Sequence, residues 1–201
     1  MTAPPPFTTL RKYVAAARKA ERCALCGTRI AANHTHLLEI GIRRMVCACE
    51  PCAILFQHRD SDRYKRIGRD IRLVPDFQIT DAEWDSLLIP IGLAFFVSRS
   101  PDGRMFAFYP GPAGCTESLL SLHAWKDIAA RNPVLNEMER DTEALLVNRM
   151  GGAREHYLVP LDRCYELVGL IRLHWRGLSG GEDAWREISR FFSTLREAAN
   201  A

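Results

Sequence analysis

The sequence predicts an α+β protein in two parts: an N-terminal module of the zinc-ribbon or rubredoxin-like knuckle type, and a duplicated β-β-α module that ends in a C-terminal helix. Three observations lead to this fold class. Two pairs of cysteines with the same two-residue gap flank an apolar hairpin pattern. A strand-turn-strand pattern recurs fifty residues further along the chain. The C-terminal residues place apolar side chains at helical spacing.

Charge divides the chain near residue 75. The formal net charge is +3 over 201 residues, but residues 1–75 contain 14 Lys and Arg against 6 Asp and Glu, and the remainder contains 13 against 18. Pro75 and the polar residues around it also interrupt the apolar pattern. We therefore expect a basic metal-binding module over residues 1–75 and the duplicated module over residues 76–201.

Composition excludes several classes of protein. With 47% hydrophobic and 25% charged residues, the chain is not of the disordered, collagen-like or fibrous type. No apolar run is long enough for a transmembrane helix, and the N-terminal residues lack the order of a signal peptide. We predict a cytoplasmic protein without membrane insertion, in which the seven cysteines stay reduced.

Residues 9–19 predict an amphipathic basic helix. Leu10, Tyr13, Val14 and Ala17 recur at helical spacing, and Lys and Arg occupy the other faces. We expect this helix to pack on its own protein rather than on a membrane or a nucleic acid.

The cysteine cluster predicts a metal site. Cys23 and Cys26 precede Gly27, and a tight turn there would point both sulfurs at one centre. Cys49 and Cys52 repeat the gap. Between the pairs, two apolar runs around a turn predict a hairpin that returns the second pair to the first. Four thiolates at one tetrahedral centre are the usual structural zinc arrangement, so we predict zinc on these four cysteines.

Iron is the alternative metal, because cysteine pairs of the same kind hold the single iron of rubredoxin. The Arg-rich setting of the hairpin and the large second module favour zinc over iron.

Cys47 is a fifth cysteine in the cluster, whereas a tetrahedral metal ion has only four ligands. Strand alternation places Cys47 and Cys49 on one face, so Cys47 is an alternative ligand; its other interpretation is a small buried apolar residue. His34 and His36 also lie near the cluster along the chain. With four well-spaced cysteines present, we expect both histidines beside the ligands or on the surface rather than on the metal.

Residues 94–110 and 144–160 predict an internal repeat. Each copy reads as strand, turn, strand, proline and helix, at a gapless offset of fifty residues. Two copies predict one four-stranded antiparallel sheet with both helices on one face, each helix adding a tryptophan to the core. The matched pairs include Ala94 and Ala144, Val97 and Val147, Arg99 and Arg149, Arg104 and Arg154, Pro110 and Pro160, and Trp125 and Trp175.

Two short segments predict helix starts. "TDAE" from Thr80 and "SGGE" from Ser179 have the spacing of capping boxes. The helix after the second segment is expected to be amphipathic and to pack on the core of the second module. Its apolar stripe comprises Trp185, Ile188, Phe192 and Leu195.

No catalytic residue is predicted, and we expect a protein without enzymatic activity. Cys115 and Cys164 follow prolines near expected helix starts, where a helix dipole would lower a thiol pKa, but neither has an evident base. The remaining histidines stand alone in the sequence: His58, His123, His156 and His174.

Residues 58–72 are rich in Arg and Lys, which would suit phosphate binding. Asp60, Asp62 and Asp70 dilute this charge, and no recognition helix or aromatic platform accompanies it. A basic surface for an acidic protein partner fits the stretch as well. A nucleic-acid-binding regulator is therefore the weakest of the functions considered.

Several segments carry a resemblance to a known family: "ERCALCG", "RRMVCACEPCAILF", "IPIGLAFFV", "DTEALLVNR" and "YLVPLDRCYELVGLIRLHWRGLSGGEDAW". Together they cover nearly the whole chain, which resembles an uncharacterised bacterial family, largely actinobacterial, encoded near nickel-iron hydrogenase genes. The resemblance implies an accessory role in the assembly, maturation or stability of such a hydrogenase, with its subunits or maturation factors as protein partners. The alternative is a rubredoxin-like iron electron carrier for the hydrogenase.

Overall fold

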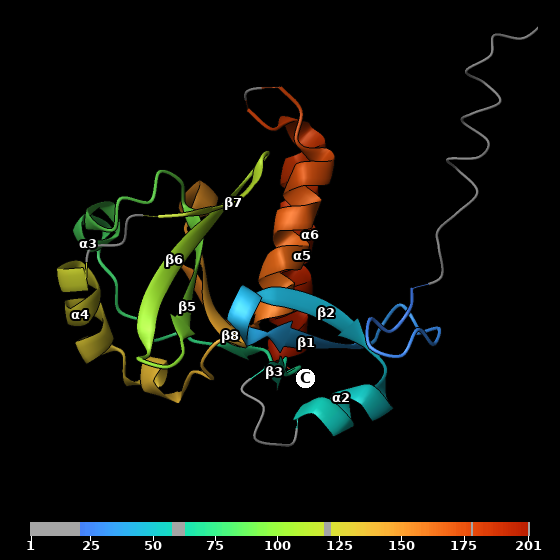
Figure 1. The fold of residues 1–201 in the computed structure, drawn as a ribbon. Coiled ribbons are helices and arrows are strands. Elements are labelled where there is room, and N and C mark those ends of the chain that lie inside the picture. The colour runs from blue at the N-terminus through green and yellow to red at the C-terminus, as the bar shows by residue number, and fades with distance from the viewer. Residues whose placement is uncertain (1–20, 58–62, 119–121, 178, 201) are drawn as a thin grey trace, which may run out of the picture. The chain divides into compact units, whose positions relative to one another are not determined.

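The computed structural model describes residues 21–57, 63–118, 122–177 and 179–200. The helix predicted over residues 9–19 and His58 lie outside these ranges, as does the side chain of His123. The chain forms two compact units, which divide between Arg66 and Ile67 (Figure 1).

The division between the units comes earlier than the predicted boundary near residue 75. Residues 67–75 belong to the second unit, where Arg72 and Leu73 pair with Leu158 and Tyr157 in its sheet. The charge change and Pro75 are local features of the sequence, and they carry no information on this long-range backbone pairing.

The first unit is a three-stranded antiparallel sheet with one helix. The strand order is β2-β1-β3, with β1 central. The hairpin predicted between the cysteine pairs is confirmed by the pairing of β1 with β2. The elements are β1 (Thr35–Glu39), η1 (Ile40–Ile42), β2 (Arg44–Ala48), α2 (Glu50–Gln57) and β3 (Tyr64–Arg66).

One face of this sheet contributes to a core cluster. Leu37, Val46 and Ala48 alternate onto that face and pack with Ala53 of α2 and Tyr64 of β3. α2 begins at Glu50 and contains Cys52, and its apolar residues beyond Ala53 are exposed.

The second unit contains a six-stranded antiparallel sheet, in the order β4-β9-β8-β5-β6-β7. Its elements are β4 (Arg72–Leu73), α3 (Asp81–Ser86), β5 (Leu93–Arg99), β6 (Arg104–Gly111), β7 (Gly114–Glu117), α4 (Leu122–Arg131), η2 (Pro133–Glu137), β8 (Glu143–Asn148), η3 (Met150–Gly152), β9 (Glu155–Pro160), α5 (Leu161–His174) and α6 (Gly181–Ala199).

The predicted four-stranded sheet has two strands fewer than the observed one. The four predicted strands are present as β5, β6, β8 and β9, but β4 and β7 extend the sheet at its two edges. Both edge strands are short, and neither shows enough alternation to be recognised as a strand.

Helices cover both faces of this sheet, not one face as predicted (Figure 1). On one face, Phe96 of β5 packs between Trp84 of α3 and Trp125 of α4, at ring-centroid distances of 6.4 and 4.7 Å. On the other face, the ring of Phe95 lies 6.1 Å from that of Tyr165 in α5. Central strands buried on both faces explain the continuous apolar runs "LAFFV" and "ALLV".

The likeness between residues 94–110 and 144–160 holds for the two hairpins and does not extend to the helices. α5 starts directly after β9, whereas β7 intervenes between β6 and α4. The fifty-residue offset therefore places Trp125 in a helix and Trp175 just past the end of one. Trp125 is buried in the core, and Trp175 is half-buried against Trp185, which corrects the expectation of two core tryptophans.

The helix starts were predicted with mixed success. Thr80 forms the expected capping box: its hydroxyl accepts a hydrogen bond from the Glu83 N–H at 3.2 Å, and the Glu83 carboxylate accepts one from the Thr80 N–H at 2.9 Å. The box predicted at Ser179 is wrong. Gly180 caps α6 without a side-chain bond, and the Ser179 carbonyl accepts a hydrogen bond from the Trp185 indole instead.

The apolar stripe of α6 packs into the second unit, as predicted, at three of its four positions. Ile188, Phe192 and Leu195 are buried, and the Phe192 ring lies 6.2 Å from that of Tyr157 in β9. Trp185, near the start of the helix, is 41% exposed, and its ring lies 5.9 Å from that of Trp175. None of the helices in the described ranges combines the length and apolar character that crossing a membrane requires.

Candidate metal centre

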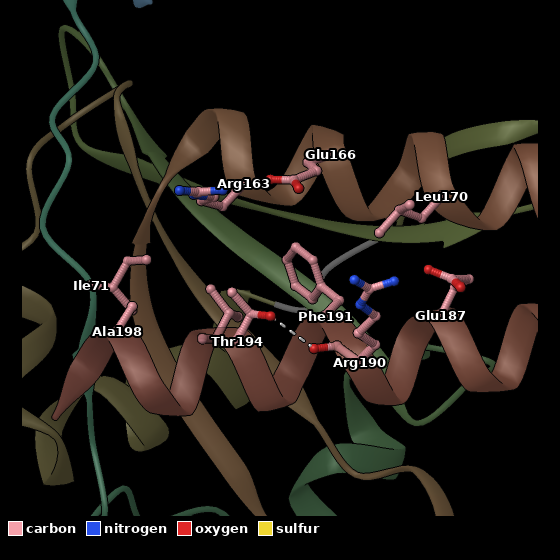
Figure 2. Close-up of a pocket in the computed structure, with 10 residues that line it drawn as sticks. Ile71, Arg163, Glu166, Leu170, Glu187, Arg190, Phe191, Thr194 and Ala198 are labelled. Atoms are coloured by element: carbon pink, nitrogen blue, oxygen red, sulfur yellow. Dashed lines mark hydrogen bonds and ion pairs between the residues drawn. The ribbon is translucent and has the colours of Figure 1, made fainter. Parts of the chain in front are cut away.

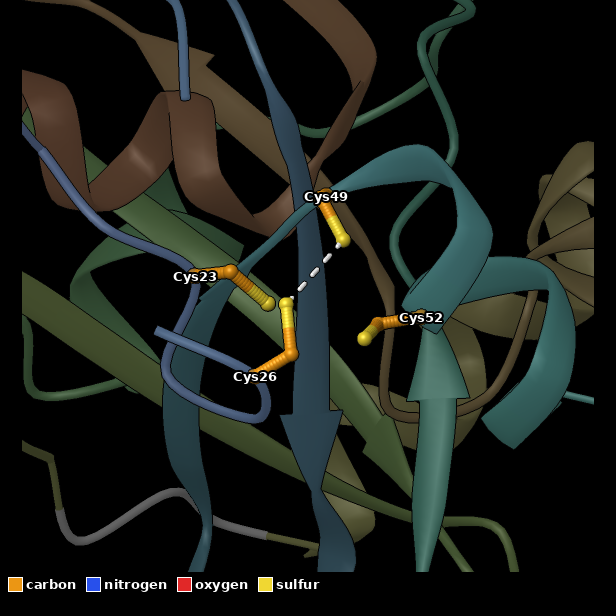
Figure 3. A group of neighbouring side chains, drawn as sticks. All are labelled: Cys23, Cys26, Cys49 and Cys52. Atoms are coloured by element: carbon orange, nitrogen blue, oxygen red, sulfur yellow. Dashed lines mark hydrogen bonds between the residues drawn. The ribbon is translucent and has the colours of Figure 1, made fainter. Parts of the chain in front are cut away.

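The first cysteine pair lies in a closed turn. The Gly27 N–H donates to the Cys23 carbonyl at 2.9 Å, and the Cys23 N–H donates to the Thr28 carbonyl at 2.8 Å. Gly27 has a φ of +76°, a conformation that residues with a Cβ rarely adopt. This turn places Cys23 and Cys26 on the same side of the backbone loop (Figure 3).

The second pair spans the junction between β2 and α2. Cys49 follows the last residue of β2, and Cys52 lies in the first turn of α2. The Ala53 N–H donates to the Cys49 carbonyl at 2.9 Å, which sets this turn. The two pairs are joined through the backbone, because the Ala24 N–H donates to the Cys47 carbonyl at 2.8 Å.

The four sulfur atoms of Cys23, Cys26, Cys49 and Cys52 converge within 4.8 Å of one another (Figure 3). The Cys26 and Cys49 sulfurs are 3.6 Å apart. This separation is too long for a disulfide bond of about 2.05 Å, and it is close to the edge of about 3.8 Å in a tetrahedron with metal–sulfur bonds of about 2.3 Å. The four side chains therefore fit a tetrahedral metal ion, and they could hold one.

The pKa values of Cys23 and Cys52 are shifted in opposite directions. Burial acts to raise the pKa of Cys23, but backbone hydrogen bonds from Cys49, Cys26 and Leu25 outweigh it and lower that pKa to about 6. Burial and the neighbouring sulfurs raise the pKa of Cys52 to about 12. Negative charge thus concentrates on Cys23 when the group has no cation. A divalent ion would stabilise all four thiolates together.

Cys47 is not one of the four cysteines whose sulfurs converge. Its sulfur gathers with ring nitrogens of His34 and His36, again within 4.8 Å of one another. Strand alternation predicted Cys47 and Cys49 on one face, but it does not apply to Cys49. β2 ends at Ala48, and Cys49 lies at the junction between β2 and α2. In the hairpin, Cys47 pairs with His36. A predicted pairing register for the two strands would have indicated this neighbourhood from the sequence.

The two cysteines of the second unit have the properties of unreactive thiols. Cys164 is fully buried in the first turn of α5, and burial raises its pKa well above the usual range. Cys115 lies in β7 rather than at a helix start, and burial raises its pKa to about 11. Both therefore stay protonated at neutral pH, which is opposite to the activation that a helix dipole would give.

His156 is buried in β9, where its ring stacks on that of Phe77 at 4.8 Å. Burial, together with the charges of Arg149 and Arg154, lowers the pKa of His156 to about 4. Among the described residues, His156 belongs to neither of the two groups of potential metal ligands.

A shallow pocket of about 180 Å³ lies between α5 and α6 (Figure 2). Charged side chains of both signs line it, with Arg163 and Glu166 from α5 and Glu187 and Arg190 from α6, around the ring of Phe191. Arg163 and Glu166 pair with each other at 2.8 Å. Neither a cysteine nor a histidine is among the described residues that line this pocket.

Comparison with known proteins places the chain in one family. A family model described as "Family of unknown function (DUF5947)" matches residues 22–199, which include all four converging cysteines. No curated protein matches the chain, and no solved structure matches it.

Proposed function

The chain belongs to this family of unknown function (DUF5947), and we propose that it is a metal-binding accessory protein that acts through protein–protein contacts and has no catalytic activity of its own. The convergence of four cysteine sulfurs within 4.8 Å carries the proposal. The bound ion in this proposal is zinc, with Cys23, Cys26, Cys49 and Cys52 as its ligands.

A structural role for the metal follows from the small core of the first unit. Among its described residues, one core cluster of six buried side chains packs between the sheet, α2 and the first cysteine turn. A structural zinc site contributes on the order of 10 kcal/mol of apparent binding energy at neutral pH. Zinc would therefore supply much of the free energy that holds the two cysteine turns and the hairpin together.

Exposed apolar residues beside the metal site support contact with another protein. Leu55 of α2 is 66% exposed, and its neighbours Ile54 and Phe56 are exposed as well. These three residues follow Cys52 on the same helix. Adjacent exposed apolar side chains of this kind often mark protein-interaction surfaces.

The partner that we propose is a nickel-iron hydrogenase or one of its maturation factors. This identification depends on the resemblance of the chain to a family encoded near hydrogenase genes. The accessory role would be in assembly, maturation or stability of the hydrogenase, and the location would be cytoplasmic.

A rubredoxin-like iron protein that carries electrons to or from the hydrogenase is the second candidate. The observation that favours it is the exposure of Cys26, whose sulfur belongs to the candidate metal site. Solvent exposure of a ligating sulfur is one of the factors that set the reduction potential of an iron–sulfur centre.

Binding of nucleic acid receives little support from the basic residues of the first unit. Arg44 and Arg63 both pair with the buried carboxylate of Glu39, at 2.7 and 2.9 Å. Arg66 pairs with Glu50 at 2.7 Å. These ion pairs use the guanidinium groups that a phosphate backbone would need.

Two measurements on the full chain test the proposal. Metal analysis of protein purified under reducing conditions is expected to find zinc bound in a colourless protein, whereas iron on four thiolates would give a red protein. Affinity capture from a host that expresses the hydrogenase is expected to recover hydrogenase subunits or maturation factors. Protein that binds no metal at Cys23, Cys26, Cys49 and Cys52 would overturn the proposal.

A further inference from the structure

The hairpin of the first unit presents a second set of metal-ligating side chains. His34, His36 and Cys47 place one potential ligand atom each within 4.8 Å of the other two. None of the three belongs to the four-cysteine group, so any ion held here would be a separate one.

The strand pairing explains how these side chains meet. His36 in β1 lies directly opposite Cys47 in β2, and cross-strand partners project from the same face of a sheet. His34 lies two residues before His36 and projects to the same side. The His34 and His36 rings are in edge contact, with centroids 4.7 Å apart. The neighbouring residues Leu37 and Ala48 point to the opposite, buried face.

The polar contacts of His34 occupy one ring nitrogen and leave the other available to a metal. Its side chain is only 7% exposed, and its Nδ1 lies 2.8 Å from the Ala31 carbonyl and 3.3 Å from the Glu21 carboxylate. Both neighbours accept hydrogen bonds, so Nδ1 carries the proton and Nε2 presents its lone pair. Metal-bound histidines commonly donate the other ring N–H to a carbonyl or carboxylate in this way.

The Nε2 atom of His34 is buried and has no hydrogen-bond partner in the described part of the chain. Leaving a buried polar atom without a partner destabilises the folded state, and most such atoms in folded proteins are satisfied. A metal ion between His34, His36 and Cys47 would supply the missing partner.

We propose that His34, His36 and Cys47 form a second binding site, for a divalent transition ion of the zinc type. Two imidazoles and one thiolate are ligands that zinc prefers. Adjacent ligand atoms in a tetrahedral zinc site lie about 3.5 Å apart, so no pair of these ligand atoms needs to close by more than about 1.3 Å on binding. Three protein ligands leave one tetrahedral position for water, so this ion would exchange more readily than one held by four cysteines.

Titration of the full, reduced chain with Zn²⁺ and Co²⁺ tests the site. The wild-type chain is expected to bind two equivalents. One cobalt equivalent should show the absorption of four thiolates, and the other should show the thiolate-to-cobalt intensity of a single cysteine. The double variant His34→Gln/His36→Gln, and separately Cys47→Ala, should each bind one equivalent and keep only the four-thiolate spectrum.

Retention of the four-thiolate equivalent shows that the variants remain folded around the cysteine turns. His174→Gln, which changes a histidine of α5, is the matched control and should still bind two equivalents. Saturation of the wild type at one equivalent with a four-thiolate spectrum would overturn the second site, as would a second equivalent that survives the substitutions. One equivalent with a single-thiolate spectrum would instead overturn the four-cysteine assignment and leave the second site standing.

Discussion

The sulfur atoms of Cys26 and Cys49 lie 3.6 Å apart, although the two residues are 23 positions apart in the chain. One sulfur comes from the turn before β1 and the other from the junction of β2 with α2. The hairpin between them returns the chain on itself and brings the two turns together. Metal binding and the folding of the first unit are therefore expected to depend on each other.

Replacement of Cys26 by serine is expected to release the metal of the four-cysteine site and to unfold the first unit, while the second unit stays folded. Cys26 is exposed, so the substitution removes a ligand without leaving a cavity in the core. The free energy of unfolding of the first unit is expected to decrease by an amount approaching the order of 10 kcal/mol that a structural zinc site contributes. Metal content per chain and amide hydrogen exchange, resolved by residue, measure the two effects.

Cys115→Ala is the control for this substitution, because it removes a cysteine of the second unit that belongs to neither ligand group. It should retain the metal and the protection of both units. Full metal content and normal exchange in Cys26→Ser would contradict the four-cysteine assignment.

Stability is expected to fall as the pH is lowered from about 6.5 to about 4, in part because of His156. Burial lowers the pKa of this residue from 6.5 to about 4 in the folded protein. Within that window the unfolded chain binds a proton that the folded chain does not, so the free energy of unfolding decreases, by up to about 3 kcal/mol for this group. Above pH 6.5 the imidazole is neutral in both states and the contribution to stability is complete.

The substitution His156→Phe isolates this effect, since a phenyl ring can keep the stacking on Phe77 and does not titrate. Urea unfolding of the second unit between pH 4 and 7 should show a smaller slope with pH in the variant than in the wild type. Equal slopes would mean that His156 titrates normally in the folded state.

Phe96→Ala is expected to destabilise the second unit by about 3–5 kcal/mol. The Phe96 ring is fully buried and lies between Trp84 and Trp125, so its removal leaves a cavity between the sheet and two helices. Chemical denaturation monitored by tryptophan fluorescence measures the change. Leu88→Ala, at an exposed position in the same unit, should change stability by less than about 0.5 kcal/mol.

Leu55→Ser is expected to weaken binding to the protein partner without loss of metal or stability. The side chain is mostly exposed on α2, so its replacement removes apolar surface available to another protein and little of the core. Affinity capture and metal content, compared between wild type and variant, check the two expectations. Undiminished capture would show that this face of α2 is not the docking surface.

The sequence alone identified the cysteine group, the hairpin between its two halves and the four central strands of the second sheet. These features depend on local patterns: a two-residue gap between cysteines, alternation within short apolar runs, and turn residues between them. The capping box at Thr80 was also predicted, because its two bonds join residues three positions apart.

The tertiary structure decided what depends on contacts between distant residues. Pairing of Arg72 with Leu158 assigned β4 to the second unit, and burial of β5 and β8 on both faces required helices on each side of the sheet. Cys47 was assigned in the same way, because its position opposite His36 is a property of the paired hairpin. Spacing along the chain selects residue types that can bind a metal, but backbone pairing across strands determines which of them share one centre.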